Sequence, residues 1–170
     1  SGVSADADAM VLTLSNVGVF VGVGGALLDN NGGAATPTDY SDDTVVNGTL
    51  GFGATVGTLT LVSIKDRGAL PLLGTDDVTY LGVALDDFAG DLVGLESVLE
   101  FHAYGVDAVL NKVSSGVLVI PAADKLDWST FTSTGLDLSA AQAALNGTTL
   151  GALTDSVDLA IDGSVVLNVL

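Results

Sequence analysis

The sequence predicts an all-β protein with long, bulged, mostly antiparallel strands in a sandwich or a solenoid-like stack, and one short helix near residues 139–145. Apolar and polar residues alternate with a period of two over long stretches, as they do in half-buried strands. Glycine is abundant, at 22 of 170 residues, and follows no collagen-like triplet repeat. Of the 21 acidic residues only Glu96 and Glu100 are glutamates, and aspartate favours turns over helices. We therefore expect residues 1–170 to form a single β-rich module, one unit of a tandem or self-assembling array.

The clearest strand signal lies in residues 155–170. The odd positions from Val157 to Val169 are apolar or glycine, whereas the even positions are mainly Ser, Asp, Ala and Asn. This alternation predicts a half-buried strand of about two to three times the usual length. Because the pattern is still running where the sequence stops, a neighbouring module is expected to continue it.

Four further strand regions are expected in residues 9–24, 44–65, 78–95 and 98–111. The first contains NVGVFVGVGG (residues 16–25), in which Gly18 and Gly22 share a face with Phe20 while valines occupy the other face. We interpret it as a buried strand whose glycines let a second layer approach closely. Gly57 and Gly105 interrupt the alternation in two other strands, where a bulge would change the apolar face.

The connections are also predicted by composition. The helix over residues 139–145 would take Ser139 as its N-cap and stop at Asn146 and Gly147. Trp128 and Phe131, in an irregular stretch before it, are expected to plug one end of the core. Surface loops or turns are expected at residues 28–43, 65–68, 74–77 and 114–116.

Charge and composition exclude several classes of function. Four basic residues against 21 acidic ones give a formal net charge of −17, which repels nucleic acids and anionic lipids. The chain has no cysteine, so disulfides, thiolate metal sites and cysteine nucleophiles are excluded. No apolar run reaches the length of about 18 residues that a membrane-spanning helix needs, so no membrane insertion is expected.

The acidic residues gather in short clusters that suit calcium, which prefers carboxylate, amide and carbonyl oxygens from flexible loops. The tightest cluster is Asp86, Asp87 and Asp91. The other candidate ligands are Asp76, Asp77, Asp29 and Asn31. No cluster matches the EF-hand loop or the glycine-rich calcium nonapeptide. Solvated turn aspartates, solubility in salty surroundings and a patch for a basic partner remain open as alternatives.

No arrangement of residues predicts catalysis. His102 is the one histidine and alternates in phase with Glu100, so a dyad is geometrically possible. A surface histidine beside a carboxylate is far commoner than a catalytic one, and no GxSxG or HExxH motif is present. We therefore expect that the chain is not an enzyme and carries no catalytic residues.

Several motifs together resemble one repeat of the giant, acidic, cysteine-free extracellular repeat proteins of bacteria, which include RTX-like and adhesin-type surface proteins. The resemblance covers about residues 3–170, and its most specific parts are FVGVGG, LVGLESV and GSVVLNV. It implies an extracellular or cell-surface module that is repeated end to end. Because the calcium nonapeptides of true RTX repeats are absent, the resemblance does not establish calcium dependence.

The resulting prediction is a structural module of a bacterial surface, adhesin or filament-forming protein. It would associate with copies of itself or with adjacent repeats through strand ends and edges, and calcium would stiffen it. The alternatives are a calcium-dependent carbohydrate- or receptor-binding module and, with less support, a fragment of an outer-membrane β-barrel.

Overall fold

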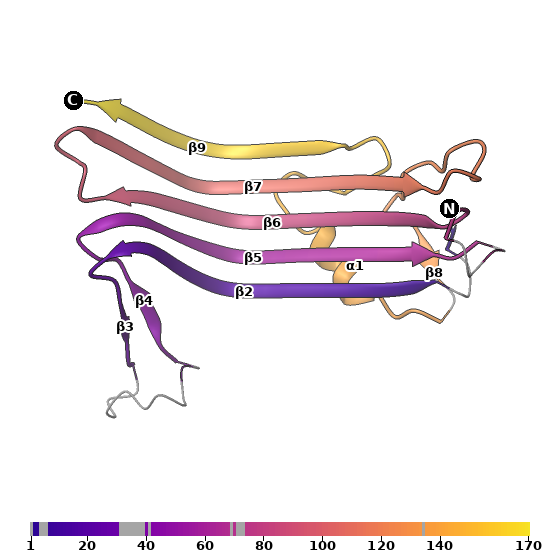
Figure 1. Ribbon diagram of the computed structural model, residues 1–170, viewed down its shortest axis with the longest axis horizontal. Helices are drawn as coiled ribbons and strands as arrows, with labels where there is room; N and C mark the ends of the chain where they lie inside the picture. The colour runs from indigo at the N-terminus through magenta and orange to yellow at the C-terminus, as the bar shows by residue number, and fades with distance from the viewer. Residues whose placement is uncertain are drawn as a thin grey trace. The chain divides into compact units, whose positions relative to one another are not determined.

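The computed structural model describes residues 2–3, 7–30, 40, 42–68, 70, 74–133 and 135–170, and its main element is a five-stranded antiparallel sheet (Figure 1). The strand order is β2-β5-β6-β7-β9. The strands are β2 (Asp8–Val23), β5 (Leu50–Asp66), β6 (Val78–Val93), β7 (Leu99–Ser115) and β9 (Leu159–Val169). The all-β prediction is confirmed, and so is the short helix, α1 (Ser139–Leu145).

Two small sheets complete the β-structure of the described residues. β1 (Gly2–Val3) pairs in parallel with β8 (Thr132–Ser133). β3 (Ala26–Leu28) pairs antiparallel with β4 (Thr44–Val46), and Leu28 lies opposite Thr44. The predicted loop over residues 28–43 thus joins the strands of a short ribbon; residues 31–39 and 41 lie outside the described residues.

The chain divides into two compact units that share the five long strands. Unit 1 comprises Ser1–Ser15, Thr58–Asp86 and Asp107–Asp162, and unit 2 comprises Asn16–Gly57, Asp87–Val106 and Gly163–Leu170. Four of the strands have a residue with positive φ within two residues of the division: Asn16, Asp87, Gly105 and Gly163. In β5 the division falls at Gly57. The alternation of the sequence had indicated a change at Gly57 and at Gly105.

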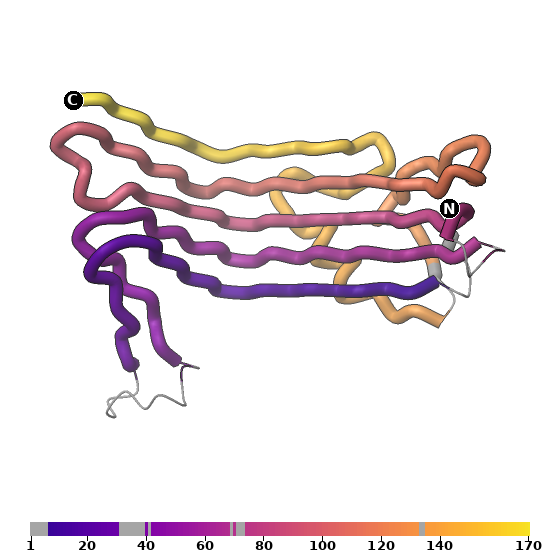
Figure 2. The backbone as a smooth tube through the Cα atoms, in the orientation of Figure 1, coloured from indigo at the N-terminus to yellow at the C-terminus, as the bar shows by residue number. Residues whose placement is uncertain are grey.

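Unit 1 has a two-layered apolar core. Alternate residues of the strands point inward, among them Val62 and Ile64 of β5 and Val109 of β7. The second layer is formed by α1 and the segments beside it, and Figure 2 shows the chain leaving β7, passing through α1 and returning to β9. Trp128 and Phe131 are buried there, with their rings edge to face at 5.5 Å, so they lie within the core as expected.

Asn111 of β7 fastens the second layer to the sheet. It is 0% exposed, and its Nδ2 donates to the carbonyl oxygens of Leu126, at 2.7 Å, and Thr154, at 2.9 Å. The indole Nε1 of Trp128 donates to Asn111 Oδ1 at 3.1 Å. One buried side chain therefore satisfies three polar groups of the layer that covers it.

The start of α1 differs from the prediction. Leu138, not Ser139, is the N-cap residue and makes no side-chain cap bond. The Asp137 carboxylate accepts from Ser139 N at 3.3 Å and from Ser139 Oγ at 2.8 Å. This short-range bonding lowers the pKa of Asp137, chiefly through the Ser139 hydroxyl. The predicted stop is confirmed, because Asn146 is the C-cap residue.

Three strand boundaries also differ. Residues 47–49 separate β4 from β5, so the expected strand over 44–65 is interrupted. β9 begins at Leu159, since Val157 packs against the core before the strand starts. β7 continues to Ser115, and Gly116 N then donates to Asp77 O at 2.7 Å; the predicted turn at 114–116 was therefore placed too early.

Replacing Asn111 with Leu should destabilise unit 1. The substitution introduces an apolar side chain of similar size and leaves the Trp128 N–H and two carbonyl groups without their partner, at about 1–3 kcal/mol for each orphaned group. We expect the midpoint of urea unfolding, followed by the fluorescence of Trp128, to fall by an amount that corresponds to more than about 2 kcal/mol. The exposed Asn168→Leu is the control, and an equal effect from both variants would contradict the anchoring role.

Candidate functional site

Of the seven predicted calcium ligands, only Asp29 belongs to the group of acidic side chains that the described residues bring close enough to share a metal ion. Asn31 lies outside the described residues. Asp86, Asp87 and Asp91 lie on β6, but Asp86 belongs to unit 1 and the other two to unit 2. Asp91 Oδ1 lies 2.6 Å from His102 Nδ1, and both side chains are about half exposed. His102, for which a dyad with Glu100 was geometrically possible, thus lies beside Asp91, an exposed histidine next to a carboxylate.

Asp76 and Asp77 fasten the turn that precedes β6. Lys65 Nζ lies 2.8 Å from Asp77 Oδ2, and Gly68 N donates to Asp77 Oδ1 at 3.3 Å. The hydrogen bond from Lys65 is the largest cause of a lowered pKa of Asp77; burial opposes it, while the Gly68 N–H and the charges of Lys65 and Arg67 add to it. Asp76 Oδ2 accepts from Leu70 N at 2.9 Å. Both carboxylates therefore have a structural partner, although Asp76 Oδ1 is buried without one among the described residues.

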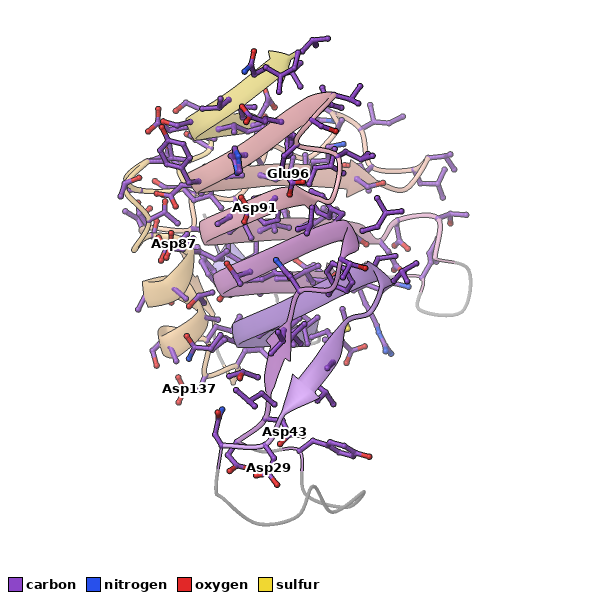
Figure 3. All side chains as sticks on the ribbon, turned by 90° about the vertical axis from the view of Figure 1, so that its left-hand side faces the viewer. Asp29, Asp43, Asp87, Asp91, Glu96 and Asp137 are labelled. Carbon is purple, nitrogen blue, oxygen red and sulfur yellow. The ribbon has the colours of Figure 1, made fainter. Side chains whose placement is uncertain are left out.

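A different acidic group comes together at the β3–β4 ribbon. Asp29, Asp42 and Asp43 each offer an oxygen, and these oxygens lie within 4.8 Å of one another. The pairing of Leu28 with Thr44 brings the two ends of the loop together, and Figure 3 shows Asp29 and Asp43 side by side at the end of the ribbon. Asn30 Nδ2 donates to the Asp42 carbonyl at 2.7 Å. Asp42 Oδ1 is buried and has no hydrogen-bond partner in the part of the chain that the structure describes. This grouping is chemically suited to a hard cation.

Sequence reasoning found Asp29 but did not join it to Asp42 and Asp43. These residues stand 13 and 14 positions further along the chain. The signal was present in the apolar triplets ALL (residues 26–28) and TVV (residues 44–46), which flank the polar loop. Two short apolar segments around a Gly- and Asn-rich loop are typical of a hairpin.

The sheet of unit 2 has one polar face and one apolar face. On the polar face Asp91 meets His102, and Asn168 Nδ2 donates to Glu100 Oε2 at 3.1 Å. The ribbon approaches this face, since a Cβ at Gly18 would lie 3.4 Å from Val45 Cβ.

Alternate residues of each strand point to the opposite side, which we call the apolar face of unit 2. There the rings of Phe52 and Phe101 are 6.2 Å apart, and a Cβ at Gly90 would lie 2.9 Å from the ring of Phe52 and 3.2 Å from that of Phe88. The face carries no charged side chain. Its residues are Val17, Val19, Val21, Val23, Leu50, Phe52, Ala54, Val56, Phe88, Gly90, Leu92, Leu99, Phe101, Ala103, Val165, Leu167 and Val169.

Many side chains of the apolar face are open to solvent. Val21 is 69% exposed, Leu167 65% and Val169 75%. Among the described residues of unit 2, only Gly53, Gly90 and Ala103 are buried, and none of these is large. The interpretation of residues 16–25 as a buried strand is therefore wrong: β2 is an edge strand, and its valines are largely exposed.

Unit 1 also has an outward sheet face without charge at its centre. The strand residues that alternate with its core residues are apolar and partly exposed, and they lie outside the core cluster. On the three central strands they are Leu59, Leu61, Leu81, Val83, Leu85, Ala108 and Leu110.

Both edges of the five-stranded sheet are long and nearly uncharged. Asp8 is the one charged residue of β2, and Asp162 that of β9. Neither strand contains proline or lysine, the residues that commonly protect an edge from pairing with another chain. Because neighbouring strands alternate in direction, the first and the fifth strand point the same way, as the arrows of β2 and β9 show (Figure 1).

No family model, no curated protein and no solved structure matches this chain. In the part of the chain that the structure describes, no helix is long and apolar enough to cross a membrane.

Acid should weaken unit 1 partly through Asp77. Its pKa is lowered in the folded state, so the ionised form stabilises the fold above the ordinary carboxyl pKa of about 3.9, and this contribution is lost as the pH falls through the folded-state value. We expect Asp77→Asn to lower the Tm at pH ~7 and to differ little from the unchanged chain at pH ~2. The exposed Asp155→Asn should match the unchanged chain at both values. A Tm difference for Asp77→Asn that does not depend on pH would contradict this role.

Proposed function

We propose that this chain is a structural module that associates with copies of itself or with like modules through the edges of its sheet. The observation that carries the proposal is the pair of long, apolar edge strands, β2 and β9, in an open sheet. An edge strand presents unpaired backbone N–H and C=O groups, which are a template for a further strand. An uncharged edge allows that approach even between strongly acidic copies.

The direction of the edges defines how copies can join. Since β2 and β9 run the same way, copies related by translation would pair β9 of one with β2 of the next in parallel. Such a head-to-tail contact does not close on itself and leads to an extended array. Copies related by a two-fold axis would pair one edge with itself, antiparallel, and stop at a dimer. A repeated module in a surface or filament-forming protein outside the bacterial cell fits the first arrangement.

Calcium stiffening belongs to the same proposal and concerns the acidic group of the ribbon. Within the acidic group of the ribbon, Asp42 Oδ1 is buried without a hydrogen-bond partner among the described residues, and this favours a cation there over a purely solvated turn. By contrast, Asp77 and Asp91 already lie beside Lys65 and His102. The ribbon is therefore the place where the calcium hypothesis is best tested.

The carbohydrate-binding alternative is less well supported. It needs aromatic side chains on display, yet Trp128 and Tyr80 are buried. Tyr40 and Tyr104 are the exposed tyrosines, at 58% and 54%.

Edge pairing should be visible in the backbone amides. We expect hydrogen exchange of β2 and β9 to slow as the protein concentration rises, because a new neighbour occupies their outward N–H groups, while exchange of the interior strand β6 stays constant. Ile161→Lys, on an edge, should raise the concentration of half-assembly by at least about tenfold. The control is Val117→Lys, in an exposed turn outside the sheet. Unchanged exchange in both edge strands at every concentration would rule out the proposal.

Calcium should raise the Tm if the ribbon binds it. A site of the affinity usual in extracellular modules would stabilise the fold by about 1–3 kcal/mol at ~10 mM calcium. We expect thermal unfolding to move up by several degrees relative to chelator. The double variant Asp42→Asn, Asp43→Asn should abolish the rise, and Asp86→Asn should leave it intact. An equal calcium effect in all three proteins would place binding elsewhere.

A further inference from the structure

We propose that the apolar face of unit 2 packs against the same face of a second copy, so that two sheets form a sandwich about a two-fold axis. This inference shares with the proposed function the idea of self-association, but it concerns a different surface. Edge pairing extends a sheet in its own plane, whereas this contact joins two sheets face to face.

The first argument is the missing cover. A sheet with an apolar face is stable when another layer buries that face. Unit 2 buries only two glycines and an alanine among its described residues, while Phe52 is 37% exposed and most valines and leucines of its edge strands are more so. Unit 1 differs, because a second layer covers its sheet. Trp128, Leu145 and Leu153 of that layer are 0% exposed.

The second argument identifies the occupant by charge. The face carries no charged residue, so a basic partner drawn to the acidic chain would find no ion pairs there. Two copies that meet through this face keep Asp91 and Glu100 on their outer sides, because these residues belong to the polar face. Self-association through it thus buries apolar surface without bringing these carboxylates together.

The third argument is the area of the apolar face and the alternation of large and small side chains on it. Five strands spaced about 4.8 Å apart, with eight residues of β2 at about 3.3 Å each, define a face of roughly 500 Å². A pair would bury on the order of 1,000 Å², the lower bound of specific interfaces. Its centre alternates large and small residues, with Phe52, Phe88 and Phe101 around Gly90. This alternation of large and small residues lets the side chains of two sheets interdigitate when the sheets lie about 10 Å apart.

The test uses adjacent residues of β9 that point to opposite faces. Leu167 lies on the apolar face and is 65% exposed, whereas Val166 points to the polar side and is 43% exposed. Both stand on the same edge, so both substitutions perturb edge pairing alike. We expect Leu167→Glu to raise the dissociation constant measured by sedimentation equilibrium at least about tenfold more than Val166→Glu does. Val21→Glu, on the other edge strand of the same face, should repeat the loss, and circular dichroism should show the fold retained.

The outcomes separate the two proposals. Equal effects of Leu167→Glu and Val166→Glu, together with slowed edge-amide exchange, would overturn the face contact and keep the edge contact. A selective loss in Leu167→Glu and Val21→Glu without edge protection would support the face contact and overturn the edge contact. A loss confined to Leu81→Glu would move the interface to unit 1 and overturn this inference. A chain that stays monomeric up to millimolar concentration would overturn both.

Discussion

How far its apolar sheet faces are covered is the constraint on which this structure depends. A sheet has two faces, and an apolar face is stable when another layer buries it. The helix α1 and the segments beside it that carry Leu126, Trp128 and Leu153 form a single layer, which covers the inner face of unit 1. The folding of unit 1 is accounted for by this layer. Unit 2 keeps the same strands but has no large buried side chain among its described residues, so its stability rests on strand pairing and on whatever packs against its apolar face.

The covering layer is held by polar contacts as well as by burial. Asn111 binds it from the sheet, while Asn146 and Gln142 of the helical segment donate to the carbonyl oxygen of Trp128, at 3.1 and 3.3 Å. An irregular segment has backbone groups that would otherwise be buried without partners. Amide side chains satisfy them here without adding charge.

The local sequence pattern was enough to predict where the strands lie. It did not predict the order in which they pair. The run NVGVFVGVGG has valines on one face and mainly glycines on the other, whether it lies inside a sheet or at its edge. Periodicity indicates which residues share a face of a strand, but not which strands lie beside it. The Asp77 carboxylate was likewise predictable as a turn residue, but its partner Lys65 stands 12 positions earlier. The acidic group of the ribbon depended on a hairpin register that no single motif encodes.

The placement of charge would allow strongly acidic copies to meet through the exposed apolar surface, as proposed above. With a net charge of −17, copies repel one another at long range, and this repulsion is screened within about 8 Å at physiological salt. Apolar contact acts only at closer range, where the uncharged edges and the apolar face of unit 2 can meet. Salt therefore lowers the barrier to approach without weakening the contact itself. Association that strengthens with ionic strength is the behaviour expected of such a surface, and ion-paired interfaces show the opposite.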